Sequence, residues 1–195
     1  MKKNYFFQTA LVVCSLAVTM MTSCKEDEKI VPATTVETGY YVKVSNEVLA
    51  TTTVEAHYID AKGLTCSEFI TSPEWKKQLP KGSLPSLAAL YIKFTPKNPE
   101  TGTKYNMELT SCVAYRVENG TGKQWSDAWT TADNLTSLVE GENVEEWCNQ
   151  HSVATAIEIQ TDGISEPTTC DFGGNAELDK NAMKEATDMT KLFGW

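Results

Sequence analysis

Apolar and polar side chains alternate most regularly between residues 105 and 117, where every second residue is apolar or small and those between are mostly polar. A two-residue period is typical of a strand that buries one face. The same period recurs at 38–60, interrupted by a turn at Asn46, and again at 87–95 and 153–161. We therefore expect strands in these segments, with 87–95 and 105–117 forming a long central hairpin.

Other segments have helical features. Ser72-Pro73 has the residue types of an N-cap and a first helical position, which predicts a short helix. From Asp133 the pattern becomes helical, with a break or kink at Gly141. The clearest helical spacing there, i, i+3, i+4 and i+7, is that of Val144, Trp147, Cys148 and His151. Asn175 is placed to cap a last helix, whose apolar positions are Leu178, Ala182, Ala186, Met189 and Phe193.

The segment 122–131 fits neither period clearly. The chain after residue 38 contains no repeat, low-complexity tract or internal linker. These patterns predict a single α+β domain, mainly an antiparallel sheet with two or three helices, the C-terminal one packed on the sheet. A β-sandwich with helical insertions is the alternative.

The first residues have a different character. Lys2 and Lys3 precede a short apolar run over 5–21, which is followed by Met21-Thr22-Ser23-Cys24 and the charged 25–28. A basic start, a short apolar run and a small residue before the cleavage position describe a secretory signal peptide. The run is too short and too interrupted by Ser and Thr to suit a membrane span.

Cys24 directly after Ser23 makes this segment resemble the bacterial lipoprotein signal, although Met21 and Ser23 stand where that family usually has Leu and Gly or Ala. The resemblance implies that Cys24 is lipidated and anchors the protein in the outer membrane. It divides the chain into a signal peptide at 1–23, a tether at 24–37 and a globular domain at 38–195. An ordinary signal peptide or an uncleaved anchor is the alternative.

The charged 25–28 is similar to the signal that sends some lipoproteins to the cell surface. A periplasm-facing position is the alternative. Removal of 1–23 takes two of the 17 basic residues and none of the 26 acidic ones, which leaves a net charge of −11. That balance argues against nucleic acid or an anionic membrane surface as a partner, because both need clustered Lys and Arg.

Four cysteines remain when Cys14 leaves with the signal peptide and Cys24 carries the lipid. Four cysteines in an exported protein can form two disulfides, and their spacing does not choose among the connectivities. No two of them have the close spacing of a zinc site, so no metal is predicted. At least one disulfide is expected among Cys66, Cys112, Cys148 and Cys170.

Candidate catalytic groups are few. His57 shares a strand face with Glu55, which could form an acid–base pair but is more typical of a solvated face. Cys148 and His151 lie one helical turn apart and could form a nucleophilic dyad or bind a metal, but packing at the end of a helix is the favoured explanation. Asp171-Phe172-Gly173 spells a kinase tripeptide without the other kinase motifs. We predict no catalytic residue and no cofactor.

Trp125 and Trp129 are the most interesting aromatic residues, because polar neighbours surround them. Exposed tryptophans offer large rigid contact areas to ligands such as sugars, whereas buried ones fill the core. The sequence thus favours a non-catalytic module that binds a glycan or an outer-membrane protein. A small hydrolase and a structural or adhesive subunit, whose sheet edge pairs with a partner strand, are the alternatives.

Overall fold

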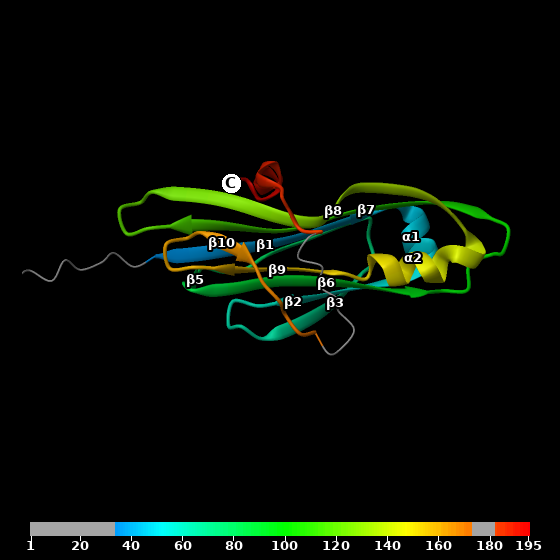
Figure 1. Cartoon of the computed structure of the whole chain (residues 1–195), viewed down its shortest axis with the longest axis horizontal. Coiled ribbons are helices and arrows are strands. Elements are labelled where there is room, and N and C mark those ends of the chain that lie inside the picture. Colours follow the sequence, from blue (N-terminus) through cyan, green and yellow to red (C-terminus); the bar gives the residue numbers. More distant parts are fainter. Residues whose placement is uncertain (1–33, 173–181) are drawn as a thin grey trace, which may run out of the picture. The chain divides into compact units, whose positions relative to one another are not determined.

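The computed structural model describes residues 34–172 and 182–195, which belong to one compact unit. This unit is mainly antiparallel β-structure, arranged as one sheet of six strands and one of five (Figure 1). The predicted predominance of antiparallel sheet is confirmed, but the strands form two sheets and the helices are short. Cys24, Asn175 and Leu178 lie outside the described residues.

The six-stranded sheet has the order β11-β8-β7-β1-β4, and β5 also pairs with β1. Its strand β1 begins inside the segment predicted to be a tether. The strands are β1 (Thr35–Val44), β4 (Glu74–Gln78), β5 (Gly82–Ser83), β7 (Lys104–Glu118), β8 (Gln124–Glu140) and β11 (Lys184–Glu185).

The five-stranded sheet has the order β10-β9-β6-β2-β3. Its strands are β2 (Thr52–Ile59), β3 (Thr65–Ile70), β6 (Ser86–Pro96), β9 (Ala154–Ile159) and β10 (Ser165–Pro167). Two short α-helices and two 3₁₀ helices complete the described chain: α1 (Asn46–Thr51), η1 (Gly141–Asn143), α2 (Val144–His151) and η2 (Thr187–Phe193).

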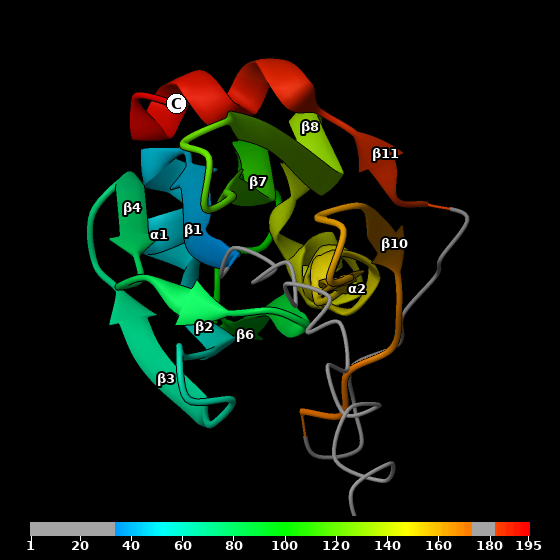
Figure 2. The same cartoon turned by 90° about the vertical axis from the view of Figure 1, so that its left-hand side faces the viewer.

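One hydrophobic core joins the two sheets, which Figure 2 shows with β1 and β7 on one side and β2 and β6 on the other. The predicted inward positions of β6 and β9 are confirmed where Leu90 and Ile157 enter this core. Tyr40 is fully buried in it and donates a hydrogen bond to the carbonyl oxygen of Ile59 at 2.7 Å. Because a buried hydroxyl without a partner is costly, this bond fixes β1 against β2.

Two local predictions near the N-terminal strands are wrong. Residues 46–51 form helix α1 instead of a strand, because Ser45 caps it by accepting a hydrogen bond from the Val48 amide. Ser72-Pro73 begins no helix and precedes strand β4, which pairs with β1. The partly buried Trp75 of β4 packs on the core, so tertiary contact outweighed the local capping pattern.

The predicted hairpin of 87–95 with 105–117 is also wrong. Strand β6 pairs with β2 and β9, whereas β7 pairs with β1 and β8, so the loop between β6 and β7 crosses from one sheet to the other. The tight turn expected at Asn119-Gly120 instead joins β7 to β8. The prediction that 105–117 is a central strand is confirmed, because β7 lies in the middle of its sheet.

Strand β8 includes most of the unassigned 122–131, from Gln124, and the first part of the predicted helix from Asp133. Its pairing with β7 shifts register between Leu109 and Ser111, and Asn134 there has a positive φ of 48°. Such a bulge bends the strand and increases its twist. The helical stripe begins only at Val144, after Gly141, where a Cβ would overlap the backbone of Glu100.

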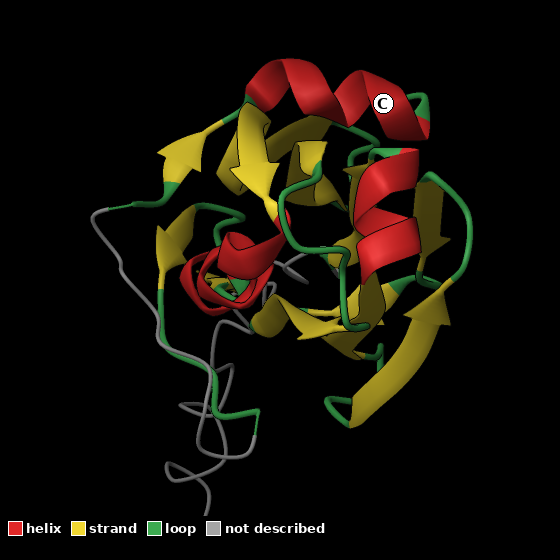
Figure 3. Cartoon of the chain, turned by 90° about the vertical axis from the view of Figure 1, so that its right-hand side faces the viewer, coloured by secondary structure: helices red, strands yellow, loops and turns green. Residues whose placement is uncertain are grey.

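The helix predicted through Ala182 and Ala186 is wrong there, because Lys184–Glu185 form strand β11. Only Thr187–Phe193 are helical, as the 3₁₀ helix η2, which packs on the outer face of the six-stranded sheet and is seen in red beside the C label in Figure 3. Phe193 of η2 packs in a small buried cluster with Tyr41, Cys112 and other sheet residues. Gly39 makes this docking possible, because a Cβ at that position would overlap the Phe193 ring.

Replacing Phe193 with Ala is expected to lower the free energy of unfolding by about 3 kcal/mol, because a buried aromatic ring leaves a cavity when it is removed. Leu192→Ala, one residue earlier on the same helix, is the control: its side chain is 37% exposed, and the loss should be below about 1 kcal/mol. Denaturant unfolding of both variants measures the difference. Equal losses would show that Phe193 does not hold η2 on the sheet.

Candidate functional site

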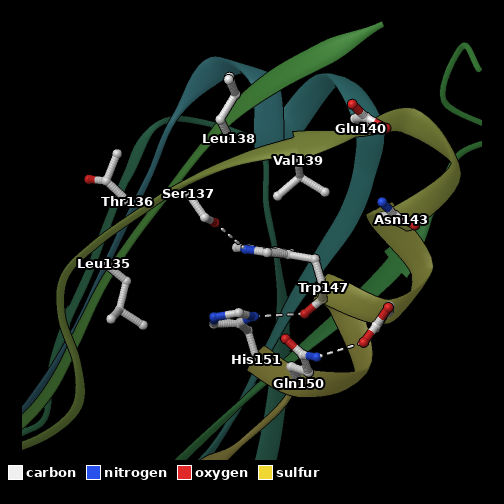
Figure 4. Close-up of a pocket in the computed structure, with 11 residues that line it drawn as sticks. Leu135, Thr136, Ser137, Leu138, Val139, Glu140, Asn143, Trp147, Gln150 and His151 are labelled. Atoms are coloured by element: carbon white, nitrogen blue, oxygen red, sulfur yellow. Dashed lines mark hydrogen bonds between the residues drawn. The ribbon is translucent and has the colours of Figure 1, made fainter. Parts of the chain in front are cut away.

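The C-terminal half of β8 and helix α2 form the walls of an open groove of about 520 Å³ (Figure 4). The 3₁₀ helix η1 turns the chain between them, so that α2 runs back beside the strand (Figure 1). The groove is lined by Leu135, Thr136, Ser137, Leu138, Val139, Glu140, Asn143, Glu146, Trp147, Gln150 and His151.

An aromatic pair from α2 occupies one side of this groove. The ring of His151 stacks on Trp147, with 4.5 Å between centroids and an interplanar angle of 20°. The Trp147 indole N–H donates to Ser137 Oγ of β8 at 3.0 Å, and its ring packs edge-on against Phe94 in the core. These contacts fix α2 against β8.

One ring nitrogen of His151 is already used in a hydrogen bond within α2. Its Nδ1 lies 2.8 Å from the carbonyl oxygen of Trp147. A carbonyl oxygen only accepts, so Nδ1 carries the proton and donates it. The other ring nitrogen points into the groove, where it is available to a ligand (Figure 4).

The backbone of β8 has an open edge along the groove. The Gly141 amide bonds to Thr103 on the β7 side, and the backbone groups of Glu108 on β7 turn away from β8 to bond with Ser45. In an antiparallel ladder, residues facing the partner strand alternate with residues facing away. Thr136, Leu138 and Glu140 therefore direct their N–H and C=O groups away from β7.

Strand β11 covers a different part of β8. It pairs only with Trp129 and Thr130, and beyond the bulge at Asn134 the only described strand that pairs with β8 is β7, on the opposite side. Helix α2 lies beside this edge, but the backbone groups within a helix bond to one another. The edge therefore faces the groove with its backbone hydrogen-bonding capacity unused by any described strand.

The groove is acidic. Glu140 lies 3.4 Å from Lys104 of the neighbouring strand, and Glu146 accepts a hydrogen bond from Gln150 at 3.0 Å. Among the described residues, Glu146 has no ion-pair partner, and the lining contains no Lys or Arg. Just outside the lining, Glu142 accepts the Gly102 amide, and this bond lowers the pKa of its carboxyl. The groove thus favours a ligand with positive charge.

A second open cleft, of about 670 Å³, lies between η2 and the outer face of the six-stranded sheet. Tyr41 and Lys43 of β1 line it together with Asp133 and Asn134 at the bulge of β8. It has neither a stacked aromatic pair nor a run of outward backbone groups among its described residues. We therefore place the candidate site in the β8–α2 groove.

The Cys148–His151 dyad, the alternative to helix-end packing, does not form. Cys148 is 1% exposed and belongs to the core between the sheets, whereas His151 stacks on Trp147 at the groove. Burial raises the pKa of the Cys148 thiol to about 11, so the thiolate that a nucleophile requires is strongly disfavoured. The helix-end packing reading of His151 is the one that the geometry supports.

His57 and Glu55 do lie together, as the strand pattern predicted. His57 Nε2 is 3.4 Å from Glu55 Oε2, but it is buried and makes no hydrogen bond to any residue that the structure describes. The predicted solvated face is instead partly covered, because the rings of Tyr91 and Phe172 lie beside the imidazole. Phe172 of the kinase-like Asp171-Phe172-Gly173 therefore serves as packing on the outer face of the five-stranded sheet; Gly173 lies outside the described residues.

Trp125 and Trp129 are partly buried and pack against the core cluster. Their indole N–H groups donate to the Gly163 carbonyl oxygen at 3.2 Å and to Ser165 Oγ at 2.9 Å. Gly163 is required beneath Trp125, because its φ is +83° and a Cβ would overlap the indole ring. The structure thus uses both tryptophans to attach the β9–β10 turn to β8.

The expected disulfide is absent: Cys66, Cys112, Cys148 and Cys170 are all free thiols in the structure. Cys112 lies in the cluster under Phe193, and Cys148 lies in the core between the sheets. Cys170 packs on the opposite, outer face of the five-stranded sheet. Cys66 of β3 packs against the same core cluster as Cys148, whereas Cys112 and Cys170 lie in two other clusters on opposite outer faces.

The described residues contain no group of three or more His, Cys, Asp or Glu side chains that could hold a metal ion. Among the same residues, no helix has both the length and the apolar character needed to cross a membrane. The chain matches no family model, no curated protein and no solved structure. The site is therefore argued from its geometry.

Sequence reasoning missed the groove because residues 135–140 were assigned to a helix. A strand signal was present: Leu135, Ser137 and Val139 share one parity, and Leu138 lies on the other face with 67% exposure. Local patterns could not show that β8 extends beyond its neighbour β11, because the length of the paired region depends on which strands pair.

Near neutral pH, we expect a thiol reagent to leave Cys112 and Cys148 unmodified in the folded chain. Burial raises the pKa of these thiols to about 12 and about 11, so almost no thiolate is available. Peptide mapping by mass spectrometry after labelling measures each site, and labelling in denaturant is the control that all four react. Rapid modification of Cys148 in the native chain would restore it as a candidate nucleophile.

Trp125→Ala and Trp129→Ala are each expected to lower the free energy of unfolding by about 2–4 kcal/mol, because each removes core packing and an indole hydrogen bond. Ser126→Ala, between them on β8, is the control and should change stability by less than about 1 kcal/mol. Thermal unfolding reports the difference. Variants as stable as the parent chain would support the two tryptophans as a ligand platform instead.

Proposed function

We propose that this chain is a lipid-anchored, non-catalytic binding protein of the bacterial outer membrane, displayed on the cell surface. The groove between β8 and α2 holds its ligand, a protein segment or a glycan. The observation that carries the proposal is the combination of an aromatic pair with an unpaired sheet edge in one open groove. Binding sites commonly pair an aromatic surface with a few directed polar groups.

The anchor and the groove suit each other. The lipobox-like Met21-Thr22-Ser23-Cys24 supports attachment through Cys24, and the acidic run that follows supports surface display. Several acyl chains on one cysteine hold a protein firmly, so the folded domain would act as a tethered receptor. The excess of acidic residues supports solubility beside the membrane.

The two alternatives differ in their support. A hydrolase with Cys148 as its nucleophile is disfavoured, because Cys148 is buried away from the groove. The structural or adhesive alternative is favoured by the open edge of β8, since an exposed edge is a template for another strand. A receptor and an adhesive subunit would use the same groove, and they differ only in whether the partner is permanent.

The proposal is tested by screening the full chain, purified in detergent, against a glycan array and a displayed peptide library. Ligands that bind are expected to lose about tenfold or more in affinity for the double variant Leu135→Ala/Gln150→Ala, which removes two exposed side chains of the groove. The ligands should be recovered unchanged after incubation, as a non-catalytic role requires.

The matched control is Leu87→Ala/Lys93→Ala, which removes an exposed leucine and an exposed polar side chain from β6 in the other sheet. Its affinities should stay within about twofold of the parent chain. Ligands that bind both double variants equally would place the site elsewhere, and ligands recovered cleaved would indicate an enzyme.

A further inference from the structure

The open edge of β8 offers one particular way to hold a ligand. We propose that an extended peptide segment of a partner protein, carrying a basic side chain, adds to β8 along residues 136–140 as a further strand. This inference rests on the proposed function, because it names the ligand class of the same groove. It differs from a glycan site in that backbone groups make the principal contacts.

The backbone provides the first argument. Thr136, Leu138 and Glu140 direct their N–H and C=O groups away from β7 toward the groove, at the two-residue spacing that a neighbouring strand requires. At about 3.4 Å per residue, this stretch matches a peptide of about five residues. Each outward amide and carbonyl then has a partner in place of water.

The surroundings of the edge provide the second argument. The bulge at Asn134 separates residues 135–140 from the part of β8 that β11 covers, and helix α2 has no free backbone groups in its middle to offer this edge. Exposed edges in native sheets are usually shortened, charged or covered. Here the edge carries Leu138 with 67% of its side chain exposed, which suits contact with a partner rather than with water.

The acidic residues of the groove indicate that the incoming segment carries a basic side chain. Glu140 forms an ion pair with Lys104 at 3.4 Å. Glu146 on the opposite wall has no ion-pair partner among the described residues, and the lining has no Lys or Arg. A Lys or Arg on the incoming strand would meet Glu146 across the groove. Pairing with a second copy of this chain would instead bring the same carboxylates together, which is unfavourable.

The experiment selects peptides from a random displayed library on the immobilised full chain and measures their affinity for two variants. Leu138→Pro removes an amide that faces the groove and leaves the ladder to β7 intact, which is where a strand tolerates proline. Leu138→Ala is the matched control, because it removes the same side chain and keeps the amide.

Selected peptides are expected to be rich in Lys or Arg with alternating apolar residues. We expect Leu138→Pro to reduce their affinity about tenfold relative to Leu138→Ala, the effect of one lost hydrogen bond and its neighbours. Glu146→Gln should weaken basic peptides and flatten the dependence of binding on salt concentration.

A second measurement leaves the protein untouched and applies even if Leu138→Pro fails to fold. Methylating the peptide amides one at a time should abolish binding at every second residue, because only those amides face β8. Insensitivity to methylation, or equal affinity for Leu138→Pro and Leu138→Ala, would overturn strand addition. If those peptides still lose affinity for Leu135→Ala/Gln150→Ala, the proposed function stands without it.

Two further outcomes also overturn the inference. Selection of no peptide would exclude an extended segment as the ligand, while glycan binding lost in Leu135→Ala/Gln150→Ala would still support the groove as a site. Dimers of the parent chain that dissociate in Leu138→Pro would show that the edge pairs with a second copy. Monomers under the same conditions are the expected result.

Discussion

The rest of the structure depends on one constraint: a strand has two faces, and the core between the two sheets can bury only one of them. Tyr40 points into that core while Tyr41, the next residue, points to the opposite face and is also buried. The outer face of β1 therefore needs its own cover, which η2 supplies through Phe193. On the other sheet, Phe172 covers Ile59 and its neighbours in the same way.

The groove arises from the same need for a cover, here at the edge of a sheet. Strand β8 extends well past the two residues that β11 pairs with, so its C-terminal half needs a neighbour. The chain supplies helix α2, which buries the apolar side chains of Trp147 and Val144 but cannot complete a ladder. A helix beside a strand shields side chains while it leaves the backbone groups of that strand unpaired, and this difference creates the site.

This arrangement links the fold to the proposed role. The Trp147 ring anchors α2 to the core through Phe94 and to β8 through Ser137, so the two walls of the groove are held at a fixed separation. A preorganised edge loses little conformational entropy when a ligand strand binds. In the proposed role, the acidic walls would select among extended segments by charge, and a lipid on Cys24 would keep the protein at the membrane.

The sequence by itself determined the features that depend on neighbouring residues. Two-residue alternation identified β6, β7 and β9 and their buried faces, and helical spacing identified the stripe that became α2. The residues around Cys24 carried the whole argument for the anchor. Only the tertiary structure decided which strands pair, because pairing depends on contacts between residues far apart in the chain. It placed β6 and β7 in different sheets. It made Ser72-Pro73 the residues before strand β4, and it buried Cys148 in the core. It also left the edge of β8 open, since an edge is defined by the absence of a neighbouring strand, which no local pattern encodes.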